Sequence, residues 1–185
     1  METRLAEMEK KVAALQTQVE TLQANAPKDQ LSLVVFSGDL DRVLAAFILA
    51  VGASAMYERV VMFFTFWGIS ALRDQKKRVK KEDLMAKMFS RMLPAGAQGL
   101  ALSKMNMLGL GTTMMKALMR SKKVLSLEDL MKAAADFGVE IVVCEMSMNL
   151  MGFSLDEMID YPNVSLGGAA KYLQEAADSK VSLFL

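Results

Sequence analysis

The chain has 185 residues, of which 53% are apolar and 23% charged, so it can form one globular domain with an appendage and is not disordered throughout. The 22 Lys and Arg residues against 21 Asp and Glu leave a net charge of +1, without the global basic field typical of nucleic-acid-binding proteins. With one Cys and no His, the chain forms neither an internal disulfide nor a His-dependent catalytic or zinc site. We therefore expect no metal, no cofactor and no nucleic-acid partner.

The N-terminus is charged and lacks the apolar run of a secretory signal. A membrane-spanning helix needs about 20 apolar residues. The two longest apolar runs, 43–56 and 60–72, hold 14 and 13 residues and are separated by Tyr57-Glu58-Arg59. We expect a cytoplasmic protein, with peripheral contact to a membrane surface as an open alternative.

Residues 1–26 carry a heptad pattern. Apolar residues recur at alternating spacings of three and four over nearly three heptads, and the positions between them are mostly polar. A stripe this narrow is typical of a coiled coil, the alternative being a helix packed on its own domain. We expect a coiled-coil helix over 1–26 that joins copies of the chain into a homo-oligomer, followed by a hinge over 27–30. The stripe consists of Leu5, Met8, Val12, Leu15, Val19 and Leu22.

From residue 31 onward, short apolar runs alternate with helical patterns. Several runs are apolar at every position, which is typical of strands buried on both faces in a parallel sheet. We predict an α/β domain over 31–185, a flavodoxin-like parallel sheet with helices on both faces. In chain order the predicted elements are a strand at 31–36, a helix at 40–53, a strand at 59–66, helices at 82–92, 112–120 and 126–137, a strand at 139–143, helical turns at 147–151 and 155–159, a strand at 163–166, a helix at 167–178 and a strand at 181–185.

Local signals support two of these helices. Asp39 can cap the helix that begins at residue 40, and Ser126 with Asp129 three residues later is close to a capping box. The basic runs at 76–81 and 116–123 are typical of solvated surface, with a phosphate, an acidic protein or a lipid head group as alternative partners.

Ligands of open α/β sheets bind beyond the carboxyl ends of the strands. Segments 37–39, 65–68 and 144–152 fall there. Cys144 stands where strand gives way to helix, and free backbone N–H groups there favour a thiolate, whereas the carboxylate of Glu145 disfavours it. The alternative is an inert buried thiol. The expected surroundings of the thiol are Ser37, Gly38, Asp39, Thr65, Gly68, Met146, Ser147, Met148 and Asn149.

Two features permit other chemistry. The turn at 37–39 could hold an anion on backbone amides, but it lacks the glycine-rich patterns of nucleotide sites, so we interpret it as a tight turn with an N-cap. The Met pairs 105/107 and 146/148 are soft ligands that suit Cu(I), but adaptable core packing or a Met-rich partner surface is the interpretation we favour.

Longer stretches occur in a fixed order along the domain: SGDLDRVLAAFIL at 37–49, FFTFWGISAL at 63–72, SKMNMLGLGTTMMKALM at 103–119, VVCEMSMNLMGF at 142–153 and the closing VSLFL. Together they resemble the DsrE/DsrF-like sulfur-carrier family, in particular its larger branch, which is often labelled peroxiredoxin-like. The resemblance runs from about residue 31 to residue 185 and leaves the heptad segment outside.

The resemblance implies a parallel α/β fold, homo-oligomeric assembly and a cysteine that carries sulfane sulfur as a persulfide between donor and acceptor proteins. Cys144 matches that cysteine. This chain has Asn149 where the family more usually has Asp, and Glu145 where it often has Gln. A relay of this kind needs one nucleophilic sulfur when the other thiols belong to partner proteins, whereas a lone Cys argues against a self-contained disulfide oxidoreductase or peroxidase.

We therefore predict a sulfur carrier with sulfurtransferase-like chemistry at Cys144, and we leave open whether it counts as an enzyme. The alternatives are a non-enzymatic oligomeric scaffold and a module that binds a small anion or nucleotide.

Overall fold

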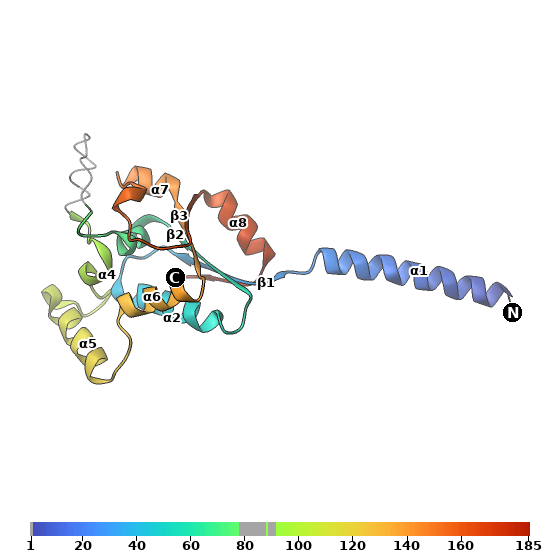
Figure 1. Ribbon diagram of the computed structural model, residues 1–185, viewed down its shortest axis with the longest axis horizontal. Coiled ribbons are helices and arrows are strands. Elements are labelled where there is room, and N and C mark those ends of the chain that lie inside the picture. The colour runs from blue at the N-terminus through green and yellow to red at the C-terminus, as the bar shows by residue number, and fades with distance from the viewer. Residues whose placement is uncertain (1, 78–87, 89–91) are drawn as a thin grey trace.

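The computed structural model describes residues 2–77, 88 and 92–185. Within these ranges, helix α1 (Glu2–Ala24) extends away from a layered α/β arrangement formed by the rest of the chain (Figure 1). The predicted helix at 82–92 and the second half of the basic run at 76–81 lie largely outside the described residues.

The core of the α/β domain is a five-stranded sheet in the order β4-β3-β2-β1-β5, and every neighbouring pair of strands is parallel. The chain moves outward from β1 to β4 and then returns to the other side of β1 for β5. Because parallel crossovers are right-handed, this reversal puts the last helix on the opposite face of the sheet. The strands are β1 (Lys28–Val35), β2 (Arg59–Phe64), β3 (Glu140–Cys144), β4 (Val164–Gly167) and β5 (Ser179–Phe184).

Helices cover both faces of the sheet, as predicted. On one face α2 and α6 pack together over the main core, where the rings of Phe47 and Phe64 lie 5.9 Å apart. On the other face α8 covers a smaller core, where Phe63 meets Tyr172 at 5.2 Å. The longer helices are α2 (Leu40–Ala53), α5 (Leu110–Ser121), α6 (Leu127–Asp136) and α8 (Ala169–Asp178), and the shorter ones are α4 (Gly96–Gly99), α7 (Glu145–Leu150) and the 3-10 helices η1 (Phe66–Leu72), η2 (Met107–Gly109) and η3 (Leu155–Glu157).

Every strand differs from its predicted range by one to three residues at one or both ends. β1 begins at Lys28 rather than residue 31, so it includes three residues of the expected hinge. β2 ends at Phe64 rather than residue 66, because Phe66 adopts a left-handed φ of 43° and the chain turns into η1. The apolar run therefore continues past the end of the strand as a short helix.

Parallel strands place α1 and Cys144 at opposite ends of the sheet. α1 leads into the amino end of β1, whereas Cys144 is the last residue of β3, at the carboxyl end. Within the part of the chain that the structure describes, no helix has the length and apolar character needed to cross a membrane.

Candidate functional site

The candidate site lies where β3 passes directly into α7. Cys144 is the last residue of the strand and also the N-cap residue of the helix, so no loop separates the two elements. Alternation along β3 turns Ile141 and Val143 toward the main core, and turns Val142 and Cys144 toward the face that α8 covers. The predicted place of the thiol at a strand-to-helix junction is therefore correct.

Two hydroxyl groups converge on the sulfur. The Oγ of Ser147, one turn into α7, donates a hydrogen bond to Cys144 Sγ at 3.4 Å. Ser147 Oγ is in turn 2.9 Å from Thr65 Oγ1, at the end of β2. All three side chains are buried, so this short polar chain is shielded from competing water.

At Cys144, hydrogen bonds outweigh burial in their effect on the pKa of the thiol. Burial is the largest single influence and raises the pKa of the thiol, because desolvation disfavours charge. Hydrogen bonds from the Ser147 side chain and backbone N–H, from the Thr65 hydroxyl and from the Met146 backbone N–H act in the opposite direction. Their combined effect is larger, so the pKa of Cys144 lies below its ordinary value.

The sulfur is not in an open cleft. Cys144 is only 3% exposed and belongs to a buried cluster on the α8 face that includes Val34, Val61 and Phe63. Tyr172 of α8 closes this cluster from outside. A thiol of another molecule therefore reaches the sulfur only after the side chains that pack around it move.

Segments 37–39 and 65–68 pack against each other. A Cβ on Gly38 would lie 2.6 Å from the Trp67 carbonyl oxygen, and one on Gly68 would lie 2.3 Å from the Val35 carbonyl oxygen. Both positions therefore need glycine. Thr65, in the second of these segments, belongs to the hydrogen-bonded chain that ends on the sulfur.

The turn at 37–39 differs from the prediction in detail. Asp39 is the N-cap residue of α2, but its carboxylate makes no capping hydrogen bond and instead accepts one from Ser37 Oγ at 2.8 Å. The Asp39 backbone N–H donates to the same Ser37 oxygen. The turn thus uses its own polar groups and presents a carboxylate, which does not suit an anion.

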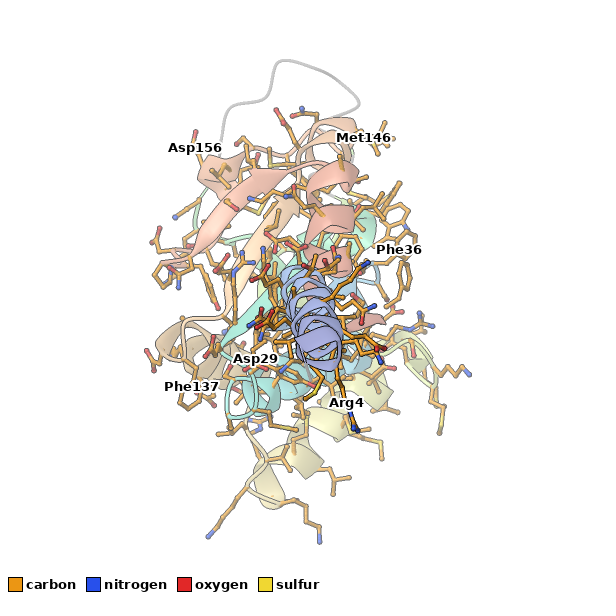
Figure 2. The ribbon with its side chains drawn as sticks, turned by 90° about the vertical axis from the view of Figure 1, so that its right-hand side faces the viewer. Arg4, Asp29, Phe36, Phe137, Met146 and Asp156 are labelled. Carbon is orange, nitrogen blue, oxygen red and sulfur yellow. The ribbon has the colours of Figure 1, made fainter. Side chains whose placement is uncertain are left out.

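The α7 residues divide between the two sides of the helix. Met148 is buried in the main core, whereas Met146 and Asn149 are exposed. In Figure 2, Met146 and Phe36 both lie at the right-hand margin of the molecule and point outward. The Met pair therefore does not gather with Cys144 into a set of soft ligands.

The sequence analysis missed two residues on the side of the sheet that Cys144 faces. Gly167 of β4 stands opposite Cys144 in the register, so no side chain occupies that position. Tyr172 packs on the cluster from α8. The alternation of β3 signals the face of Cys144, but the strand order that brings β4 and α8 beside it is not visible in the sequence.

Comparisons with known proteins show the family of the chain. The model of the DsrE/DsrF/DrsH-like family matches residues 27–184. The chain belongs to this family. A relative in Bacillus subtilis (strain 168), the uncharacterized protein YrkE, is 41% identical over 154 residues, which are 83% of this chain and 95% of YrkE.

The comparisons also found a further relative and a solved structure. The sulfur carrier protein DsrE2 of Allochromatium vinosum is 33% identical over 162 residues, which are 84% of this chain and 98% of DsrE2. Among solved structures, the ychN protein of E. coli has a TM-score of 0.49 at 10% identity, covering 85% of this chain and 99% of ychN. Because the family match begins at residue 27, helix α1 lies outside it.

Proposed function

We propose that this member of the DsrE/DsrF/DrsH-like family is a sulfur carrier that holds sulfane sulfur as a persulfide on Cys144 and passes it between partner proteins. Family membership and the 33% identity to the sulfur carrier DsrE2 support a role in sulfur relay. The observation that carries the choice of residue is the set of hydrogen-bond donors from Ser147, Thr65 and Met146 that lowers the pKa of the thiol.

The proposed chemistry needs no net oxidation. The Cys144 thiolate attacks the outer sulfur of a donor persulfide, R–S–SH. A sulfur–sulfur bond forms on Cys144, the donor's sulfur–sulfur bond breaks, and the donor leaves as a thiol. An acceptor thiolate then attacks the outer sulfur on Cys144 in the same way, and Cys144 returns as the thiolate. The Ser147 hydroxyl stabilises negative charge on Cys144 before the first step and after the second.

Burial of the sulfur has a role in this proposal. A persulfide at a 3% exposed position is shielded from stray thiols, so it reacts slowly with small molecules and faster when a docking protein shifts the side chains around it. The sulfur also adjoins α7, a helix of six residues that supplies Ser147 and whose first turn carries the exposed side chains of Glu145 and Met146. A partner that contacts this turn acts directly on the backbone donors of the site.

Mass spectrometry of the intact chain tests the proposal. After incubation with glutathione persulfide or polysulfide, we expect wild-type protein to gain the mass of one sulfur atom, and Cys144→Ser to gain none. Ser54→Ala, which removes a hydroxyl bound to the Ala50 carbonyl in α2, is the matched control and should gain sulfur as wild type does. Absence of the adduct in wild type with both donors contradicts the proposal.

The burial of Cys144 favours a second candidate, a non-enzymatic oligomeric scaffold. In that case the thiol is an inert part of the small core on the α8 face, and the projecting α1 supplies the main function by assembling copies of the chain. This candidate predicts that a small disulfide reagent labels Cys144 only after the protein is unfolded. Labelling of the native protein at a rate that rises with pH supports the relay instead.

A further inference from the structure

Helix α1 presents a row of large apolar side chains to solvent. Figure 2 looks along this helix, with Arg4 labelled near its free end and side chains radiating from it. The row is between 49% and 71% exposed. Polar side chains of α1 bind within the helix itself. The Thr17 hydroxyl donates a hydrogen bond to the Ala13 carbonyl, and Lys11 forms an ion pair with Glu7. The exposed row comprises Met8, Val12, Leu15, Val19 and Leu22.

We propose that α1 pairs with α1 of a second copy of this chain in a parallel, in-register, two-stranded coiled coil. The inference goes beyond sulfur relay and does not depend on it. Heptad counting puts Leu5, Val12 and Val19 at position a, of which two are β-branched, and Met8, Leu15 and Leu22 at position d. β-branched residues at a with Leu at d favour parallel two-stranded coils, because each type packs best in that layer.

Charge complementarity supports the same orientation. In a parallel pair, a residue at position g faces the residue five positions later, at position e, in the partner helix. Arg4 at g thus faces the partner subunit's Glu9 at e, and symmetry forms this attractive pair twice. In the antiparallel pairing that overlaps fully, Glu9 faces Gln16 and Lys11 faces Gln18, so no ion pair forms.

Because the connection between α1 and the sheet is short, a parallel coiled coil also fixes where the two α/β domains lie. Only residues 25–27 separate α1 from β1. With helix axes about 10 Å apart and about 3.5 Å per extended residue, the two β1 strands begin within roughly 40 Å of each other, at one end of the coil. Both sheets then direct their amino ends toward the coil. Both copies of Cys144 lie on the far side, where the coil does not obstruct a docking protein.

Disulfide trapping tests the orientation. With Cys144→Ser as background, Leu22→Cys supplies one cysteine at position d, and Thr17→Cys supplies a matched control on the same helix at position f, facing away from the seam. Under mild oxidation we expect Leu22→Cys to form covalent dimers at least about tenfold faster than Thr17→Cys, because only facing Cβ atoms reach disulfide distance. Equal rates overturn the proposal. Cross-linking confined to a mixture of Val12→Cys and Leu15→Cys chains also overturns it, because those positions face each other only in the antiparallel pair.

Charge reversal gives a second, independent readout. Arg4→Glu places like charges opposite each other twice in the parallel dimer, so we expect its dissociation constant to rise on the order of tenfold at low salt. The double variant Arg4→Glu/Glu9→Arg restores both attractions and should recover the wild-type constant in sedimentation analysis. If the single and double variants dimerise alike, the parallel register is wrong. Neither experiment uses Cys144, so failure here is distinguishable from failure of the sulfur-relay proposal.

Discussion

Replacing Ser147 by Ala isolates the contact that most directly favours a charged sulfur at Cys144. The substitution removes the 3.4 Å hydrogen bond to Sγ and keeps the backbone donors of residues 146 and 147 and the hydroxyl of Thr65. A hydrogen bond to a charged group contributes about 1.5–3 kcal/mol, and because three donors remain we take the lower end of that range. A change of about 1.4 kcal/mol lowers the thiolate-to-thiol ratio tenfold at a given pH. The pKa of Cys144 should therefore rise in Ser147→Ala.

NMR of the isotope-labelled protein measures this directly, because the chain has a single Cys and its Cβ chemical shift reports ionisation without any reagent entering the site. Ser32→Ala is the matched control: Ser32 is also fully buried, bonds to another hydroxyl, that of Ser182 at 2.6 Å, and faces the α8 side of the sheet. We expect the control to lose stability without changing the titration of Cys144. If Ser147→Ala titrates as wild type does, the hydroxyl does not set the charge of the sulfur, and the reasoning fails.

Three further predictions concern stability. Gly68→Ala puts a Cβ 2.3 Å from a β1 carbonyl oxygen and should lower the free energy of unfolding, measured in urea, by about 3 kcal/mol. Gly52→Ala, with open space around it in α2, should raise that free energy by about 0.5–1 kcal/mol. Similar values for both variants would contradict the packing. The pKa of Glu175 is lowered, first by its bond to Arg59, so its stabilisation is present above the unfolded pKa of about 4.3 and is lost as pH falls through the lower folded pKa. Glu175→Gln should therefore show a shallower loss of stability in acid, and an unchanged acid slope would refute this. The lowered pKa of Cys144 likewise stabilises the fold above the unfolded pKa of about 8.5, so wild type should gain stability relative to Cys144→Ser as pH rises from the folded to the unfolded pKa.

Short-range signals in the sequence predicted several elements closely. α2 begins at Leu40 and ends at Ala53, as its helical periodicity indicated. The capping box of Ser126 and Asp129 forms in both directions, with the Ser126 hydroxyl accepting from the Asp129 backbone and the Asp129 carboxylate accepting from the Ser126 backbone. These features depend on residues within one or two helical turns, so the order of residues is sufficient to find them.

Features that depend on distant packing were harder to predict. The apolar run after Arg59 gave no sign that the strand stops at Phe64, where Phe66 turns the chain into η1 and Gly68 packs against the β1 backbone. For Asp39, the choice between capping α2 and accepting from Ser37 depends on a turn held against η1. In both cases the deciding neighbour belongs to another element.

From sequence alone, the chain was expected to be a parallel α/β protein with a lone cysteine at the end of its third strand and an amphipathic heptad helix at its start. Periodicity and capping depend on residues close together in the chain, so they can be recognised from the sequence. Only the tertiary structure decided that the sulfur of Cys144 is covered rather than open, and that Thr65 and Ser147, 82 positions apart, meet beside it. The order of the strands brings those residues together. No local pattern encodes strand order, because strand pairing and burial depend on contacts between segments that are distant in the chain.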